Sequence, residues 1–264
     1  VSGDGVMFDM SAPEAGTVFD GTEFTISTST LSASWSGFSD AVSGILFYEY
    51  AFGTSDNPTE LIDYTATGLD NNISISGLSL VHGGAYVFSV RAVDNVGNVS
   101  AAIATDGIVA DHIGPIGYGV VDGDSVDIDR QNFTEFYSGH WALFQDDISG
   151  LSAHEYALYD STASDYLTAW ESAGLDTAIL ISDLDLSSDH IYQLHVRGLD
   201  QVNNIGDFVS SDGVLIDFSA PAEPQSLVGF FSTQRIYLTW DANVEEDLSF
   251  YKVYAGTESE AIVP

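Results

Sequence analysis

Carboxylate and amide side chains are the groups in this sequence whose types and spacing could do chemistry. Of 264 residues, 40 are Asp or Glu and only 5 are Lys or Arg, so the formal net charge is −35. Calcium prefers oxygen ligands from carboxylates, amides and backbone carbonyls, and takes about six to eight of them. The placement of the acids therefore decides between cation sites and a generally acidic surface.

The same composition excludes several classes of protein. A charge of −35 repels nucleic acids and anionic membranes. The chain has no cysteine, which excludes disulfides, thiolate zinc sites and cysteine nucleophiles. Because 45% of the residues are hydrophobic and 12% aromatic, a folded core is expected. No apolar run approaches the roughly 20 residues of a membrane span.

Internal sequence repeats indicate the domains that must position these acidic side chains. A ten-residue segment starting Asp-Gly at residue 4 returns at residues 106 and 212, which gives periods of 102 and 106 residues. A second segment, 90–98, returns as 196–204. We therefore expect the last strand of a preceding repeat at 1–12, full repeats at 13–114 and 115–220, and the first part of a further, truncated repeat at 221–264.

Alternation of apolar and polar residues predicts what each repeat folds into. Tyr86, Phe88, Val90 and Ala92 share one face of a strand, and residues 192–198 repeat this pattern. Helical periodicity is scarce. Half-buried strands separated by turns, in units of about 100 residues, predict an all-β chain of antiparallel β-sandwiches strung in tandem.

Particular residues add a resemblance. Leu80 precedes Tyr86 by six residues, and Leu186 precedes Tyr192 by six. This spacing resembles the tyrosine corner of fibronectin type III domains, in which the tyrosine hydroxyl bonds back across the turn between the fifth and sixth strands. Segments 236–240 and 250–254 resemble strands B and C of that family. Together the motifs resemble fibronectin type III/Ig-like repeats of very large bacterial or archaeal cell-surface or secreted proteins.

In this topology the loop between the second and third strands (B–C) and the loop between the sixth and seventh strands (F–G) lie at the same end of the domain. The linker from the preceding repeat joins the domain at this end. Acids and amides of those three segments should therefore converge, and we predict that they bind calcium and stiffen the joint between repeats. The candidates are Asp9, Asp40, Asp94, Asn95 and Asn98 for the first repeat, Asp111, Asp146, Asp147, Asp200, Asn203 and Asn204 for the second, and Asp217, Glu245, Glu246 and Asp247 for the third.

A simpler interpretation stays open, because Asp and Asn are common turn formers without any metal. Another acidic run, 122–129, lacks the spacing of an EF-hand loop and is expected to be a turn followed by a solvated strand.

The register of strands C and F predicts exposed ion pairs between Arg91 and Glu49 and between Arg197 and Glu155. His154 should face inward and His195 outward, so that they do not form a metal site.

Trp170, between strands C and E, is expected to pack at the sheet edge, with sugar stacking as the alternative.

The sequence contains no motif of a known catalytic class, and we expect no enzyme activity. The predicted function is a structural spacer of an extracellular surface protein, such as a stalk, filament, adhesin or surface-layer region. Its expected partners are neighbouring repeats and other copies in a filament or surface layer. The alternative is an ancillary glycan-binding or spacer region of a secreted polysaccharide-degrading enzyme.

Overall fold

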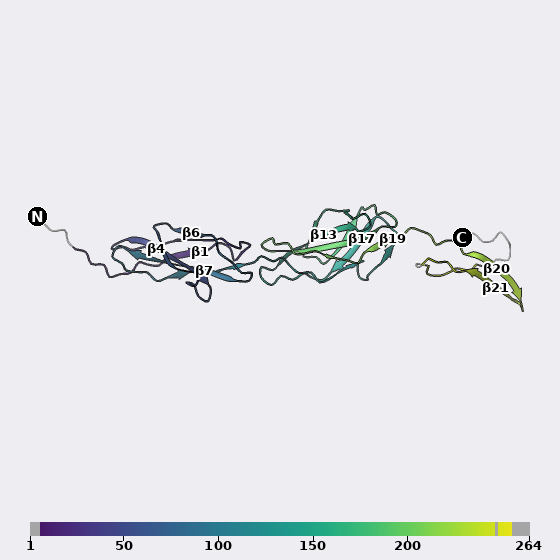
Figure 1. Ribbon diagram of the computed structural model, residues 1–264, viewed down its shortest axis with the longest axis horizontal. Helices are drawn as coiled ribbons and strands as arrows, with labels where there is room; N and C mark the ends of the chain where they lie inside the picture. Colours follow the sequence, from purple (N-terminus) through teal and green to yellow (C-terminus); the bar gives the residue numbers. More distant parts are fainter. Residues whose placement is uncertain (1–5, 246–247, 255–264) are drawn as a thin grey trace. The chain divides into compact units, whose positions relative to one another are not determined.

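The computed structural model describes residues 6–245 and 248–254, and in these residues the chain forms strands and loops without a helix (Figure 1). No element in this part of the chain has the length and apolar character of a membrane-spanning helix. The chain divides into two units, 1–216 and 217–264. The first unit contains two β-sandwiches, and the second contains one hairpin.

The first sandwich is built from nine strands. A three-stranded sheet has the order β1-β3-β6, and a second sheet has the order β2-β9-β7-β4-β5 with β8 paired to β7. All pairs are antiparallel except β2 with β9. The strands are β1 (Thr17–Phe19), β2 (Phe24–Thr25), β3 (Leu31–Ser36), β4 (Ile45–Thr54), β5 (Ile62–Gly68), β6 (Asn72–Ile75), β7 (Ala85–Asp94), β8 (Ile103–Ala104) and β9 (Ile108–Ala110).

The second sandwich repeats this arrangement. Its sheets have the orders β10-β12-β16 and β11-β19-β17-β13-β14, with β15 paired to β13 and β18 paired to β17. The strands are β10 (Val120–Asp122), β11 (Arg130–Gln131), β12 (Phe136–Trp141), β13 (Leu151–Asp160), β14 (Asp165–Tyr166), β15 (Glu171–Gly174), β16 (Ala178–Ser182), β17 (Ile191–Asp200), β18 (Val209–Ser210) and β19 (Val214–Ile216).

Each sandwich encloses its own hydrophobic core. Trp35 packs edge-on against Tyr48 in the first core, and Trp141 packs edge-on against His154 in the second. Trp35 and Trp141 are 2% and 4% exposed. A fully buried large apolar side chain stabilises the fold by about 1.5–3 kcal/mol. The inward face of strand F is confirmed, since Tyr86, Phe88, Val90 and Ala92 of β7 are buried.

The expectation that strand F is buried on only one face is wrong for much of its length. Val87 and Ser89, on the other face of β7, are also buried. For Ser89, a side chain of the same sheet provides cover: the hydroxyl of Tyr64 on β5 lies 2.9 Å from Ser89 Oγ.

Both tyrosine corners form as predicted. The amide of Val81 donates a 2.9 Å hydrogen bond to the Tyr86 hydroxyl, and the amide of Ser187 donates a 3.0 Å bond to the Tyr192 hydroxyl. The register of strands C and F is confirmed as well. Glu49 pairs with Arg91 across β4 and β7, and Glu155 pairs with Arg197 across β13 and β17.

The ion pairs follow from that register. Arg91 Nε donates to Glu49 Oε2 over 2.7 Å, and Arg197 donates to Glu155 Oε2 through both Nε and Nη2.

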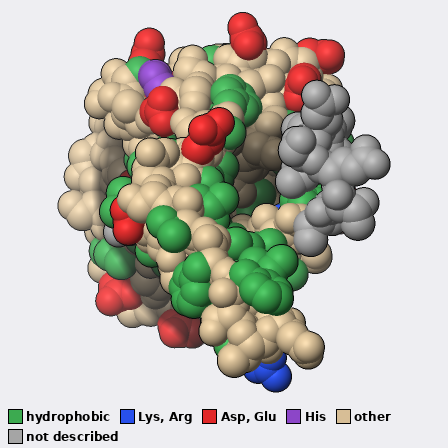
Figure 2. Space-filling view, turned by 90° about the vertical axis from the view of Figure 1, so that its right-hand side faces the viewer, with side chains coloured by type: hydrophobic (Ala, Val, Ile, Leu, Met, Phe, Trp, Pro, Cys, Tyr) green, Lys and Arg blue, Asp and Glu red, His purple; other side chains and the backbone are tan. Residues whose placement is uncertain are grey.

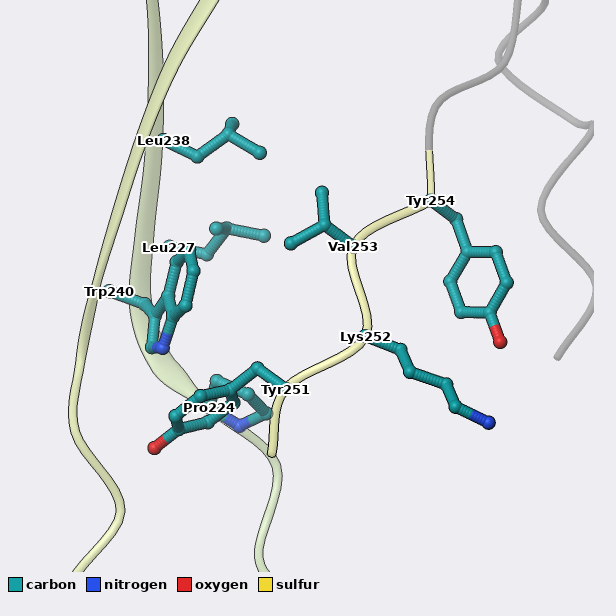
Figure 3. Close-up of a pocket in the computed structure, with 8 residues that line it drawn as sticks. All are labelled: Pro224, Leu227, Leu238, Trp240, Tyr251, Lys252, Val253 and Tyr254. Atoms are coloured by element: carbon teal, nitrogen blue, oxygen red, sulfur yellow. The ribbon is translucent and has the colours of Figure 1, made fainter. Parts of the chain in front are cut away.

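The second unit is a hairpin of β20 (Gln225–Ser232) and β21 (Arg235–Asp241) with a following segment beside it. The expected strand B, 236–240, lies within β21. The expected strand C, 250–254, forms no strand. In both sandwiches strand C pairs with strand F, and the described part of the second unit contains no strand F. The apolar face of the hairpin therefore lines an open hollow of about 280 Å³ around Trp240 and Tyr251 (Figure 3).

Residues 6–12, expected as part of a last strand G, likewise form no strand. Strands β9 and β19 pair with strands β7 and β17, and residues 6–12 have no such neighbour among the described residues. Val6 and Phe8 are consequently exposed.

The acidic surface is dispersed. On the face drawn in Figure 2, Asp and Glu side chains are scattered, whereas Lys and Arg side chains are scarce.

Candidate metal centres at the start of each repeat

The B–C loop lies between β3 and β4 in the first sandwich and between β12 and β13 in the second, and in each it carries an aspartate that organises the loop. Asp40 Oδ1 accepts hydrogen bonds from the amides of Ser43 and Gly44, each 2.7 Å long. Asp146 Oδ1 accepts bonds from the amides of Ile148 and Gly150, at 3.2 and 2.6 Å. The turn thus uses one carboxylate oxygen of each aspartate, as turn chemistry predicts. The other carboxylate oxygen of each aspartate, Oδ2, accepts none of these hydrogen bonds.

The F–G loops contribute fully buried acids. Asp94 ends β7 and Asp200 ends β17, and both are fully buried. Asp94 accepts bonds from the amides of Val96 and Asn98 and from Asn98 Nδ2, at 2.9, 2.8 and 2.7 Å. Asp200 repeats these three bonds at 2.9, 2.8 and 2.7 Å.

Two opposing effects set the pKa of Asp94. Burial raises it, but hydrogen bonds from Asn98, Val96 and Gly97 outweigh burial and leave the pKa below its usual value. A carboxylate in this state is ionised at neutral pH and presents a full negative charge to its neighbours.

The linkers supply the third carboxylate. Asp9 Oδ1 accepts bonds from the Ser11 amide and hydroxyl at 3.0 and 2.6 Å, and the Ser11 hydroxyl bond is the main cause that lowers the pKa of Asp9. Asp111 is fully buried, and its Oδ2 accepts a 3.1 Å bond from the Ser149 amide. Asn98 Nδ2 donates to the Ser11 carbonyl at 3.0 Å. Asn204 Nδ2 donates to the Asp111 carbonyl at 3.1 Å. Each linker is thereby held against the F–G loop.

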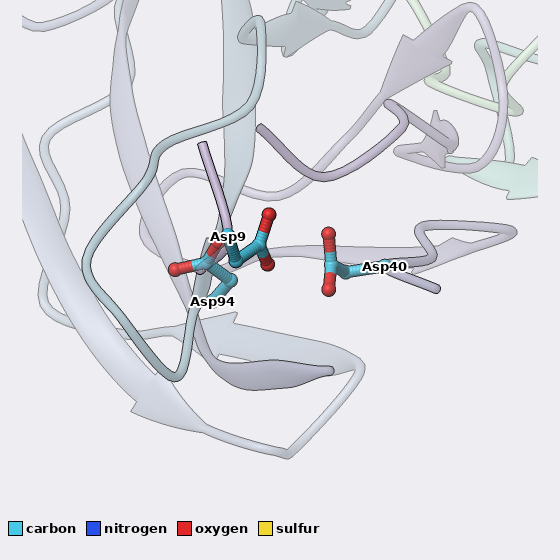
Figure 4. A group of neighbouring side chains, drawn as sticks. All are labelled: Asp9, Asp40 and Asp94. Carbon is cyan, nitrogen blue, oxygen red and sulfur yellow. The ribbon is translucent and has the colours of Figure 1, made fainter. Parts of the chain in front are cut away.

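The three predicted segments converge at both joints. Oxygens of Asp9, Asp40 and Asp94 lie within 4.8 Å of one another (Figure 4), and oxygens of Asp111, Asp146 and Asp200 do the same. Calcium–oxygen distances of about 2.3–2.6 Å put opposite ligands about 4.6–5.2 Å apart, so the separations suit one ion. Three carboxylates at this distance repel one another strongly in the absence of a cation.

Unpartnered polar atoms accompany both groups. Ser149 is 5% exposed, and among the described residues its hydroxyl has no hydrogen-bond partner although its amide binds Asp111. Within the same part of the chain, Asp9 Oδ2 is also buried without a partner. A buried hydroxyl or carboxylate oxygen without a partner costs free energy, and a bound cation would remove that cost.

The remaining candidates have other roles or lie elsewhere. Asn95 Nδ2 donates to the carbonyls of Ser43 and Gly44, so Asn95 joins the F–G and B–C loops. Asp147 is exposed and, within the described residues, belongs to neither group. Asn203 has a positive φ of 66° in the F–G turn. Asp217 accepts a bond from the Ser219 amide. Glu245 accepts one from the Ala222 amide. Asp247 and Glu246 lie outside the described residues.

One acidic group was missed in the sequence. Asp122, Asp127 and Asp212 form a third group in the second sandwich. The expectation that the run 122–129 is solvated is wrong for Asp122, which is fully buried and accepts hydrogen bonds from the Tyr137 hydroxyl and the Gly213 amide. Burial raises the pKa of Asp122. The sequence feature that could have indicated this burial is Tyr137, a tyrosine at the position where the first repeat has Leu31.

The histidines behave as expected. His154 is fully buried between Trp141 and Phe144, and its two ring nitrogens bond the Phe144 amide and the Asp176 carbonyl. His195 lies on the opposite face of the sheet. Trp170 is half-buried beside the edge strand β15, with the guanidinium of Arg197 4.1 Å from its ring centre, so edge packing is confirmed.

Comparisons with known proteins show the fold. A crystal structure of titin domains aligns with a TM-score of 0.51 and 11% identity, over 78% of this chain and 67% of that one. The FN1–FN3 domains of chicken CNTN1 align over 89% of this chain and 76% of theirs, with 13% identity and a TM-score of 0.28. No family model matches, and no curated protein matches. The chain is an all-β protein of tandem antiparallel β-sandwiches, and its fold is similar to that of the titin domains.

Proposed function

We propose that this chain is a non-catalytic spacer in an extracellular surface protein, and that calcium fastens each linker to the sandwich that follows it. The observation that carries the proposal is the repeated three-carboxylate group. Linker, B–C loop and F–G loop each supply one aspartate in both repeats. The fold alone requires turn-forming side chains in these loops. It does not require three carboxylates that repel one another.

Calcium is the cation that this donor set favours. The ligands are carboxylate oxygens, with a serine hydroxyl and backbone carbonyls nearby, and the chain offers no cysteine. Hard oxygen donors on flexible loops suit calcium, whereas zinc prefers nitrogen and sulfur ligands. The extracellular setting agrees with this choice, because millimolar calcium is available to weak sites of extracellular modules. The resemblance to repeats of bacterial or archaeal surface proteins supports the same setting, as do the partners expected in a filament or surface layer.

Calcium titration of the metal-free protein tests the proposal. We expect calcium to raise the melting temperature, since a ligand that binds only the folded state stabilises it by about 2.7 kcal/mol at about 100 times its Kd. Asp94→Asn should remove the response of the first joint and Asp200→Asn that of the second. Asp63→Asn, an exposed aspartate outside both groups, is the matched control. Unchanged melting and no bound calcium in calorimetry would refute the calcium sites.

The stiffening itself needs a distance measurement. The chain has no cysteine, so Ala66→Cys and Ala178→Cys place two spin labels, one on an exposed strand position of each sandwich. If calcium fastens the linker, the distribution of label-to-label distances narrows when calcium is added and broadens again with a chelator. An equally broad distribution in both states would show that bound calcium does not stiffen the joint.

A further inference from the structure

A column of aromatic rings stands on the outer face of the second sandwich. Tyr159 of β13 stacks on His195 of β17 at 4.9 Å and 21°, and His195 stacks on Phe208 at 4.5 Å and 16°. Tyr166 of β14 closes the side of the column, edge-on to His195, and its hydroxyl bonds His195 Nδ1 at 2.9 Å. Burial lowers the pKa of His195, so the column is uncharged at neutral pH.

The first sandwich shows that the fold does not require this column. The positions that match Tyr159, His195 and Phe208 are Gly53, Ser89 and Ala102. Both sandwiches have the ion pair between strands C and F, Arg91–Glu49 and Arg197–Glu155. In both, an aromatic ring lies over the arginine: Tyr64 over Arg91 and Trp170 over Arg197. The second repeat therefore carries three additional rings on a face that the first repeat completes without them.

The column ends at Phe208, whose ring centre also lies 6.2 Å from that of Trp170, with the two rings tilted by 53°. Phe208 is 49% exposed and Tyr166 is 41% exposed, although both are large apolar side chains. Phe208 also lines a groove of about 560 Å³ that runs between the linker 112–117 and the loop 205–209. Next to it, Asp207 is exposed and lines the same groove. An exposed flat ring beside a hydrogen-bonding carboxylate in a groove is a combination that recognises a ligand with both an apolar face and hydroxyls.

We propose that Phe208, with Tyr166 and Asp207, forms a binding site for a neutral polysaccharide. A pyranose ring offers its flat C–H face to Phe208 and its hydroxyls to Asp207. The net charge of −35 selects against anionic polymers. A cationic ligand calls for rings on several sides of one charge, whereas here the rings of Tyr159, His195 and Phe208 stack on one another. The platform is Phe208 rather than Trp170, because Phe208 is exposed whereas Trp170 is half-buried with the Arg197 guanidinium over one face of its ring.

Affinity electrophoresis of the whole chain tests this site. The gels contain one soluble neutral polysaccharide each, namely a β-glucan, a mannan or a galactan, with alginate as an anionic arm and polylysine as a cationic arm. We expect at least one neutral polymer to retard the chain. Phe208→Ala, which installs the residue found at Ala102, should weaken this binding by at least about tenfold. Leu69→Ala, which removes a side chain that is 67% exposed on the first sandwich, is the matched control and should bind normally.

Folding and the calcium sites are monitored separately. Phe208→Ala should retain a cooperative melting transition above the assay temperature and the calcium response of the parent chain, so that loss of glycan binding cannot be ascribed to unfolding or to the joints. The proposal is overturned if no neutral polymer retards the chain, if Phe208→Ala binds as well as the parent, or if polylysine alone binds. It is equally overturned if sedimentation shows a dimer that Phe208→Ala dissolves, since the column would then be a contact between copies.

Discussion

The two sandwiches of this chain agree at their joints and differ on their sheets. Asp94 and Asp200 accept the same three hydrogen bonds at the same distances, and the tyrosine corners match within 0.1 Å. The hydrophobic cores of the two sandwiches, in contrast, contain different residues at matching positions. Tyr48 packs against the core tryptophan of the first sandwich, and His154 occupies that position in the second. The aspartates of the F–G loops thus vary less between the two repeats than the core residues beside the tryptophans.

This difference teaches which constraints are local. A joint carboxylate is fixed by a loop that donates several amides to it, so a substitution that removes the side-chain oxygen leaves those amides without an acceptor. A core position is fixed by volume and by the satisfaction of polar atoms, and a histidine with both nitrogens bonded meets that condition as well as a tyrosine.

The largest effect is expected from the core tryptophans, which test whether the two sandwiches are equally dependent on them. Trp35→Ala and Trp141→Ala should each destabilise their own sandwich by about 3–5 kcal/mol, because each removes a large, almost fully buried side chain. Chemical denaturation followed by tryptophan fluorescence and circular dichroism measures the loss. A variant that unfolds both sandwiches in one transition would show that they do not fold independently.

An intermediate effect should come from converting a second-repeat residue to its first-repeat counterpart. Tyr137→Leu removes the hydroxyl that bonds buried Asp122, and we expect a loss of about 1–3 kcal/mol at neutral pH. Burial already raises the pKa of Asp122, and loss of this bond raises it further.

The sign of the pH dependence follows. A group with a raised folded-state pKa destabilises the fold once it ionises, so the difference between Tyr137→Leu and the parent should shrink as the pH falls through the raised pKa of the variant. Stability curves between pH 4 and 8 measure it. A difference that grows toward low pH would contradict the role given to Asp122. Leu31→Ala removes a buried apolar side chain and no hydrogen-bonding group, and serves as the control.

The smallest effects are expected at the surface ion pairs. Double-mutant cycles of Arg91 with Glu49 and of Arg197 with Glu155 should give coupling energies of about 0.2–1 kcal/mol, because both pairs are partly exposed. The second pair should couple more strongly, since Arg197 donates two bonds to Glu155 and Arg91 donates one. Equal couplings would mean that the additional bond is offset by the ordering of the side chain. Both couplings should weaken in high salt.

Much of the candidate site was predictable because it depends on connectivity. Asp40 and Asp94 lie more than fifty residues apart, but sandwich topology places the B–C and F–G loops at one end, so loop position sufficed to bring them together. The register of strands C and F was predictable for a related reason, since a slip by one residue would turn Val90 outward.

The additional features of the second repeat were not predictable in this way. Tyr166 and Phe208 contact His195 from a short edge strand and from a loop, and neither belongs to a regular alternation that fixes its direction. Asp122 looked like one acid in a run of solvated acids. Its burial depends on Tyr137, which reaches it from the neighbouring strand.

The sequence by itself determined the repeat, the all-β sandwich and the convergence of three aspartates at each joint, because periodicity and strand order act on the backbone. Only the tertiary structure decided which acid is buried, which ring covers an arginine and which ring stays open. Those outcomes depend on contacts between side chains of different strands, and spacing along the chain does not specify such contacts.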